Sequence, residues 1–268
     1  MNILVCVKQV PDTNEIKIDP VTNTLVREGV PSIVNPFDGY ALEAAARIKD
    51  NAPDTRIVVL SMGPKQAEAA LRDCLAIAAD KAYLASDRAF GGSDTLATSY
   101  ILSRAIAKVE ELEGVKFDAI FCGKQAIDGD TAQVGPELAE QLHYPQVTYG
   151  LEASLASDGL HVLREAEDGN EVIGVQLPCL VTFTKPSFDP RFPTIKRKMA
   201  ARKAQITSIT AADLKNLDVT RAGLKGSPTN VKRTFVPPRK QAGVIVKEQT
   251  VEASAHRLYE LLNKAHVI

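Results

Sequence analysis

The sequence predicts an α/β fold: a doubly wound, mostly parallel sheet with antiparallel additions and a C-terminal arm that ends in a helix. In the first half of the chain, short apolar runs typical of strands buried on both faces alternate with amphipathic helical patterns. From about residue 147, shorter extended pieces are separated by strong turn signals. Apolar residues make up 45% of the 268 residues, which is ample for a folded core.

Four apolar runs in the first half are expected to form parallel strands with helices between them. Asn35 and Pro36 suit the N-cap and first turn of a helix over residues 37–50. Pro64 plays the same part for a second helix, and Asp94 begins a third with Leu96 on its apolar face. The expected strands are residues 3–7, 56–61, 82–85 and 119–122.

Ligands of such a sheet bind beyond the carboxyl ends of its strands. The segments that follow these ends should therefore converge on one crevice. They are residues 6–10, 62–64 and 86–92, together with the loop after Cys122.

The second half is expected to continue the sheet with antiparallel strands or hairpins, because Asp158-Gly159 and Asp168-Gly169-Asn170 are turn signals. Residues 185–203 carry seven Lys or Arg against one Asp and predict an exposed basic loop and connector. The net charge of −1 argues against nucleic acid as the partner of this segment. The expected extended pieces are residues 147–154, 160–165, 171–176, 179–184 and 205–210.

The composition points away from side-chain catalysis. No serine or cysteine lies in a known nucleophile motif, and the histidines lack metal-ligand spacing, so any chemistry would be that of a bound cofactor. The four cysteines form no C-x-x-C pair, and the opening apolar stretch is too short for a signal peptide or a membrane span. These features predict a cytoplasmic protein without membrane insertion. The histidines are His143, His161, His256 and His266.

The loop over residues 123–135 is the most informative segment, because a buried strand leads into it and Pro136 marks the start of a helix. Glycines let a backbone approach a ligand closely, and a helix N-terminus attracts phosphate. Neither G-x-x-x-x-G-K-[ST] nor G-x-G-x-x-G is present, so the loop is no ordinary NTPase or dehydrogenase fingerprint. A nucleotide is the expected occupant, and a flexible surface turn is the alternative.

Within this loop, Asp128 and Asp130 would repel a phosphate. We therefore assign phosphate contact to the backbone N–H groups of residues 131–134 and to the Thr131 hydroxyl. The two carboxylates would cap backbone donors or bind ribose hydroxyls. Lys124 would offset phosphate charge or remain solvated.

A second glycine-rich segment, residues 86–98, also leads into a helix, at Asp94. Two phosphate-binding helix starts in one crevice suit a pyrophosphate better than a single phosphate, which favours a dinucleotide such as FAD over AMP. An ordinary loop with Asp94 as a helix cap is the alternative.

Residues 1–213 are expected to form the nucleotide- or flavin-binding domain, and residues 214–268 an arm without a core of its own. The final helix, over residues 251–265, has one apolar face that must be buried either on its own domain or in another subunit. This face comprises Ala255, Leu258, Leu261, Leu262 and Ala265.

Several segments, in order along the chain, resemble the β-subunit of electron-transfer flavoproteins, most closely the electron-bifurcating group. They are residues 3–8, 35–38, 61–64, the loop from Gly123, and residues 164–182. The resemblance implies a Rossmann-like domain paired with an α-subunit that holds an electron-carrying FAD. The β crevice holds structural AMP in ordinary members and a second FAD in bifurcating ones.

By this resemblance, Asp94, Thr95 and Thr98 would contact the extra flavin, and Gly129 makes room for a ligand larger than AMP. The implied cofactor-binding residues are Cys6, Asn35, Pro36, Phe37, Asp38, Met62, Gly63, Gly91, Asp94, Thr95, Thr98, Gly123, Lys124, Gln125, Ala126, Ile127, Asp128, Gly129, Asp130, Thr131, Gln133 and Val134.

The resemblance implies a flavin-dependent oxidoreductase subunit that needs its α-subunit for activity. FAD in the β site would take a hydride from NADH and divide the electrons between ferredoxin or flavodoxin and, through the α-subunit FAD, an acyl-CoA-type dehydrogenase. A non-bifurcating subunit with structural AMP is the alternative. The arm would wrap the α-subunit, and Ile195 would be an exposed anchor for partner dehydrogenases, unless it packs internally.

Overall fold

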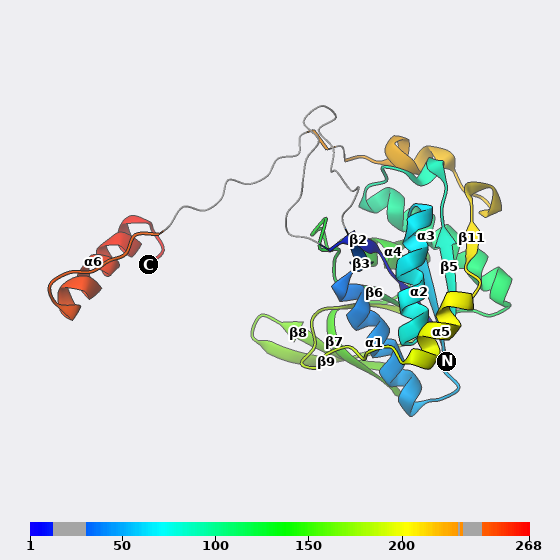
Figure 1. Ribbon diagram of the computed structural model, residues 1–268, viewed down its shortest axis with the longest axis horizontal. Helices are drawn as coiled ribbons and strands as arrows, with labels where there is room; N and C mark the ends of the chain where they lie inside the picture. Colours follow the sequence, from blue (N-terminus) through cyan, green and yellow to red (C-terminus); the bar gives the residue numbers. More distant parts are fainter. Residues whose placement is uncertain (13–30, 230, 233–242) are drawn as a thin grey trace. The chain divides into compact units, whose positions relative to one another are not determined.

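The computed structural model describes residues 1–12, 31–229, 231–232 and 243–268. Its main feature is a nine-stranded sheet with strand order β11-β5-β4-β1-β6-β10-β7-β8-β9 (Figure 1). From β11 to β7 neighbouring strands are parallel, and β8 and β9 continue the sheet antiparallel. This is the mostly parallel α/β fold with antiparallel additions that the sequence predicts.

The strands of this sheet are β1 (Asn2–Cys6), β4 (Arg56–Met62), β5 (Lys81–Ala85), β6 (Ala119–Gly123), β7 (Gln146–Ala156), β8 (Gly159–Ala166), β9 (Gly169–Val175), β10 (Cys179–Phe183) and β11 (Thr207–Ile209). A separate antiparallel pair is formed by β2 (Gln9–Pro11) and β3 (Ser32–Val34). The helices are α1 (Pro36–Asn51), α2 (Glu68–Ile77), α3 (Thr95–Glu113), α4 (Val134–Leu142), α5 (Ile195–Lys203) and α6 (Val251–Lys264).

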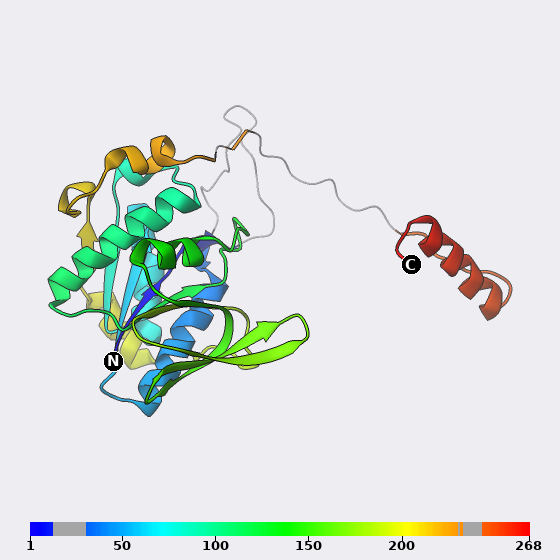
Figure 2. The same cartoon turned by 180° about the vertical axis from the view of Figure 1, so that it is seen from behind.

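Helices cover both faces of the sheet, because successive residues of a strand point to opposite sides. On one face, Ile3 and Val5 of β1 belong to a core that includes residues of α1 and α2. On the other, Leu4 belongs to a core that includes residues of α3 and α4. Figures 1 and 2 show the two faces in turn. The strands are thus buried on both sides, which explains their uninterrupted apolar sequences.

Two details of the expected helices differ. Helix α4 begins at Val134, so Pro136 lies within the first turn, where its missing N–H leaves no helical hydrogen bond unmade. Leu96 was expected on the buried face of α3, but it is 41% exposed. It lies in the first turn of α3, ahead of the buried part of the helix.

The prediction of a basic loop over residues 185–203 is wrong for its last part, which forms helix α5. Thr194 caps this helix by accepting a hydrogen bond from the Arg197 N–H at 3.2 Å. Arg197 donates to the carbonyls of Leu75 and Ala79 at the end of α2, and Arg72 of α2 donates to the Ala201 and Ala204 carbonyls. Arginine contacts with backbone carbonyls therefore hold α5 on α2, and only Ala201 of the helix is buried.

The first compact unit continues past the expected boundary at residue 213 and includes residues 214–229 and 231–232. Short turns of 3-10 helix at Val219–Arg221 and Gly223–Gly226 follow β11. Leu214, Ala222 and Ser227 are buried there. The abundance of Lys, Arg, Pro and Gly after Leu214 predicts an arm without a core, and that composition does not reveal the few side chains that are buried.

Of the residues described, 243–268 form the second unit, which contains α6. Thr250 caps this helix by accepting a hydrogen bond from the Ala253 N–H at 3.1 Å. None of its residues is buried, and Leu258 is 49% exposed. The expected helix is present, with its apolar face uncovered.

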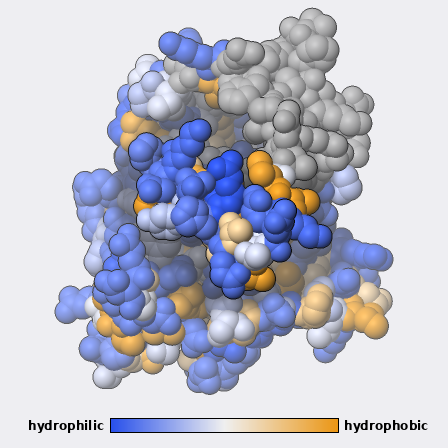
Figure 3. Space-filling model, turned by 90° about the vertical axis from the view of Figure 1, so that its left-hand side faces the viewer, coloured by the Kyte–Doolittle hydropathy of each residue, from blue (hydrophilic) through white to orange (hydrophobic). Residues whose placement is uncertain are grey.

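One face of the molecule is seen in a space-filling view. In the space-filling view, hydrophilic side chains dominate the visible face and apolar ones lie in small separate groups (Figure 3). None of the helices in the described ranges is long and apolar enough to cross a membrane.

Candidate functional site

The carboxyl edge of the sheet has a topological switch point beside β1. The chain leaves β1 toward β4 and β5 on one side, and later returns to β6 and β10 on the other. The loops after β1 and β6 therefore diverge and leave room for a ligand between them. Neighbouring strands place Cys6, Met62, Ala85 and Gly123 at this edge.

Asp38 joins three segments at the switch point. Its Oδ2 accepts a hydrogen bond from the Lys8 N–H at 2.7 Å, and its Oδ1 accepts from the Gly123 N–H at 3.1 Å and the Asn35 Nδ2 at 3.0 Å. Burial raises the pKa of Asp38 to about 7, against the opposing effect of these donors. The start of α1 is thereby bonded to the ends of both β1 and β6.

Asn35 extends this network into the loop after β6. Its Nδ2 also donates to the Gln125 carbonyl at 2.8 Å, and its Oδ1 accepts from the Ile127 N–H at 3.2 Å. The close approach requires glycine at position 123, because a Cβ there would lie 2.3 Å from Asp38 Oδ1 and 2.7 Å from the Asp38 backbone nitrogen. Asn35 and Asp38 therefore position the loop.

Both carboxylates of the loop are engaged by other side chains of the chain. Lys8 Nζ lies 2.7 Å from Asp128 Oδ1, and Gln125 Nε2 donates to Asp130 Oδ1 at 2.7 Å. Their partners in the structure are side chains, whereas the expectation was that they cap backbone donors or bind ribose hydroxyls. Lys124 lies with its Nζ 5.0 Å from the centre of the Tyr149 ring.

The backbone beyond Asp130 forms a concave row of donors. Ala132 has a positive φ of 52° and Gln133 is right-handed helical, the alternation that forms an anion-binding nest. Among the residues that the structure describes, none accepts a hydrogen bond from the backbone N–H groups of Thr131, Ala132 or Gln133. Gly135 then allows α4 to lie against β10, since a Cβ there would be 2.4 Å from Thr182 Cγ2.

The starts of α3 and α4 are adjacent. The Thr95 hydroxyl donates to Glu137 Oε1 at 3.1 Å and also lies 3.4 Å from Gln133 Oε1, so its one proton is shared between the two oxygens. The other carboxyl oxygen of Glu137 is buried without a partner in the described part of the chain, and burial raises the pKa of this group. The two helix N-termini that the sequence analysis paired for a pyrophosphate thus lie side by side.

The Asp94 carboxylate is occupied by the protein itself. It caps α3 by accepting from the Ala97 N–H at 3.0 Å, and it accepts from the N–H and hydroxyl of Thr229 at 3.0 and 2.8 Å. The Asp94 N–H donates to Ser227 Oγ at 2.8 Å. The helix-cap alternative for Asp94 therefore describes its contacts in the structure.

Two further residues that were expected to bind the cofactor, Cys6 and Gly63, make contacts within the protein at the strand ends. Cys6 and Cys122 are buried free thiols, and the neighbouring Cys6 together with burial raises the pKa of Cys122. The Gly63 N–H donates to the Ala85 carbonyl at 3.0 Å, joining the ends of β4 and β5. No group of three His, Cys, Asp or Glu side chains suited to a metal ion occurs within the described ranges.

Two site residues escaped the sequence analysis. Lys8 pairs with Asp128, and its position immediately after the central strand was a usable signal. Glu137 gave no signal beyond lying in the first turn of a helix.

Ile195 is 80% exposed at the first position of α5, and Phe192 beside it is 90% exposed. Arg191 fixes this segment, with Nε 2.8 Å from Glu43 Oε2 and Nη2 2.6 Å from Asp50 Oδ2. The Arg47 guanidinium lies 3.6 Å from the centre of the Phe188 ring. Exposed apolar side chains are therefore presented on a well-anchored segment, and the internal-packing alternative for Ile195 does not hold in this chain.

Comparison with known proteins identifies the family. A family model described as the electron transfer flavoprotein domain matches residues 22–214. The chain is 52% identical over 248 residues to the electron transfer flavoprotein subunit beta of Megasphaera elsdenii, covering 92% of each chain. The chain belongs to the β-subunit family of electron transfer flavoproteins.

Two further relatives of this β-subunit carry different names. It is 50% identical over 268 residues to the caffeyl-CoA reductase-Etf complex subunit CarD of Acetobacterium woodii, covering 100% of both chains. It is 46% identical over 256 residues to protein FixA of Sinorhizobium fredii, covering 94% of this chain and 88% of that protein. A β-subunit implies an α-subunit as its partner.

Proposed function

We propose that this chain is the β-subunit of an electron-bifurcating electron transfer flavoprotein and that its switch-point crevice binds FAD. Bound FAD would supply the redox chemistry, taking a hydride from NADH and dividing the electron pair between ferredoxin or flavodoxin and the α-subunit FAD, which serves an acyl-CoA-type dehydrogenase. Because the flavin carries this chemistry, no side chain of the chain needs to act as an acid or base.

The observation that carries the proposal is the paired helix starts of α3 and α4, joined through Thr95 and Gln133. A pyrophosphate carries two phosphate groups, and two adjacent helix N-termini offer donors and positive potential to both. The N–H groups of residues 131–133 are directed to no protein acceptor among the described residues, so they are available to an anion. The residues present fit a dinucleotide.

Different residues of the crevice would have different roles in nucleotide binding. Asp38, Asn35 and Gly123 hold the loop in place through the hydrogen bonds described above. The Thr131 hydroxyl and the neighbouring N–H groups would bind phosphate. Burial raises the pKa of Glu137, which lies beside Thr95 at this position.

Space in the loop also supports a large ligand. A Cβ added at Gly129 would meet no atom within 4 Å, so this part of the loop is open. The name of the Acetobacterium woodii relative places it in a complex with a reductase of caffeyl-CoA, which is an acyl-CoA. This supports an acyl-CoA-type dehydrogenase as the proposed partner of the present chain.

The alternative is a non-bifurcating subunit that holds AMP as a structural ligand. The occupied Asp94 carboxylate favours it, because Asp94 is then not free to contact a flavin. The nest at residues 131–133 would suffice for the single phosphate of AMP.

The nucleotide content of the complex distinguishes the two. We expect the heterodimer co-purified with its α-subunit to release two FAD and no AMP on denaturation, as quantified by absorbance and chromatography. NADH should then reduce the complex. Release of one FAD and one AMP per heterodimer would contradict bifurcation and support the alternative.

We also propose that Ile195 is an anchor for the partner dehydrogenase, because its apolar side chain is exposed on a segment that Arg191 holds rigidly. Ile195→Asp should slow electron transfer to the dehydrogenase by about tenfold or more, since an acidic group cannot enter an apolar pocket without cost. Nucleotide content should be unchanged. Val172→Asp, at a residue 68% exposed on β9, is the matched control, and equal rates for the two variants would count against the proposal.

A further inference from the structure

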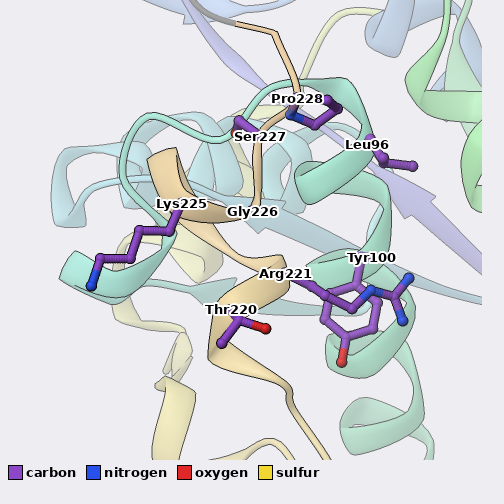
Figure 4. Close-up of a pocket in the computed structure, with 8 residues that line it drawn as sticks. All are labelled: Leu96, Tyr100, Thr220, Arg221, Lys225, Gly226, Ser227 and Pro228. Atoms are coloured by element: carbon purple, nitrogen blue, oxygen red, sulfur yellow. The ribbon is translucent and has the colours of Figure 1, made fainter.

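A pocket of about 350 Å³ lies between α3 and the turns over residues 219–228, next to the segment that carries Asp94, Thr95 and Thr98. Leu96 and Tyr100 of α3 form one wall, and Thr220, Arg221 and Ser227 lie opposite (Figure 4). Its volume is within the range of small-molecule sites. Leu96 and Tyr100 are one helical turn apart, so they share a face of α3.

The pocket has an excess of positive charge. The Arg221 guanidinium lies 3.9 Å from the centre of the Tyr100 ring, and that of Arg104, which does not line the pocket, lies 5.1 Å from the same ring. Neither side chain, nor that of Lys225, donates a hydrogen bond to any residue in the described ranges. Arg104 Nε is buried and has no partner there. Two guanidinium groups at one ring repel each other unless an anion offsets them.

The neighbouring carboxylate does not remove this excess. Asp218 Oδ1 accepts hydrogen bonds from the N–H and hydroxyl of Thr220 at 2.9 and 2.6 Å. These bonds hold the pKa of Asp218 below its ordinary value, with a smaller effect from the charge of Arg221. The Asp218 carboxylate is thus already bonded to Thr220 and acts on Arg221 through its charge alone.

The walls of the pocket are rigid. Tyr100 is 2% exposed, and its hydroxyl accepts a hydrogen bond from the Asp218 N–H at 2.9 Å. Ser227 is 7% exposed and donates to the Gly223 carbonyl at 2.8 Å. A guanidinium stacked on a buried ring is held in one orientation, so its N–H groups are preorganised for a ligand.

We propose that this pocket binds a small anion bearing a phosphate or carboxylate group. Arg221 would donate to its oxygens with the planar fork that matches such groups, and the Thr220 side chain lines the same pocket. Leu96, which is 41% exposed, provides an apolar surface for the rest of the ligand. The argument is independent of which nucleotide occupies the crevice.

The test is a calorimetric titration of inorganic phosphate into the heterodimer purified with its nucleotides bound, at low ionic strength. We expect one saturable phosphate site per heterodimer whose affinity depends on Arg221. Arg221→Gln should lower the affinity of this site about tenfold or more, and Arg221→Lys should retain part of it. Arg202→Gln, at an exposed arginine of α5 away from the pocket, should bind as the parent does.

Thermal unfolding and flavin absorbance of each variant confirm that the fold and bound nucleotides are retained. The proposal fails if the parent complex shows no saturable phosphate site or if Arg221→Gln binds phosphate unchanged. It also fails if Arg221→Gln weakens association with the α-subunit while the parent binds no phosphate, because the pocket would then be a protein contact.

Discussion

Gly123→Ala is expected to destabilise the protein by about 2–3 kcal/mol and to abolish nucleotide retention. The added Cβ would lie 2.3 Å from Asp38 Oδ1 and 2.7 Å from both the Asp38 nitrogen and the Phe37 carbonyl carbon. Two of these three atoms belong to the backbone of α1, so no flexible side chain can move aside. The start of α1 and the end of β6 must separate, which breaks the hydrogen bonds to Asp38.

Urea unfolding and nucleotide content of the purified complex measure both effects. Gly174→Ala, on strand β9, is the matched control, because its Cβ would come no closer than 3.7 Å to its nearest neighbour, the His161 side chain. That variant should unfold within about 0.5 kcal/mol of the parent. A Gly123→Ala protein with parental stability and bound nucleotide would show that the contact at α1 is not needed to hold the loop.

Asp38→Asn is expected to have the second largest effect, a loss of about 1–3 kcal/mol at mildly acidic pH. The carboxyl group accepts from Lys8, Asn35 and Gly123, and an amide has only one oxygen for these three donors. At least one donor is left facing the amide nitrogen. Asp54→Asn, at an exposed residue, provides the control for loss of a carboxylate.

The penalty of Asp38→Asn should also depend on pH. The pKa of Asp38 is raised in the folded state to about 7, so between about pH 4 and 7 the folded protein binds more protons than the unfolded chain. The stabilisation that comes from protonated Asp38 in the folded state is fully present below the pKa of Asp38 in the unfolded chain. It is lost as the pH rises through about 7, the pKa of Asp38 in the folded protein. The stability of the parent relative to Asp38→Asn should therefore decrease over this range. Urea unfolding of both proteins from pH 4.5 to 8 tests it, and parallel profiles would contradict it.

The parallel core was predictable because strands buried on both faces need uninterrupted apolar runs, and β1, β4, β5 and β6 have them. Helix α5 was not predictable in this way, because it has almost no apolar face and is held by Arg72 and Arg197. The periodicity of apolar residues indicates which face of a helix or strand is buried, but it does not indicate single arginines that donate hydrogen bonds to carbonyls far away in the sequence.

In the candidate site, too, some features could be predicted from sequence patterns and others could not. Glycines and helix starts marked the loop over residues 123–135 in advance, since only those residues permit close backbone approach. The roles of Lys8 and Glu137 depend on Asp128 and Thr95, which are far away in the sequence. A single charged residue belongs to no repeating pattern in the sequence. Its partner can be identified only once the three-dimensional arrangement of the strands is known.

The position of β10 in the sheet does not follow its position in the chain, so the sheet cannot be completed in the order in which its strands are synthesised. This strand lies between β6 and β7, yet it emerges from the ribosome after both of them and after the β8–β9 hairpin. The Lys124 N–H, at the start of the nucleotide loop, bonds the Phe183 carbonyl at the end of β10. During translation the loop is therefore anchored on one side only, and its geometry is completed when β10 inserts between strands already made, a non-local step of the kind that slows folding.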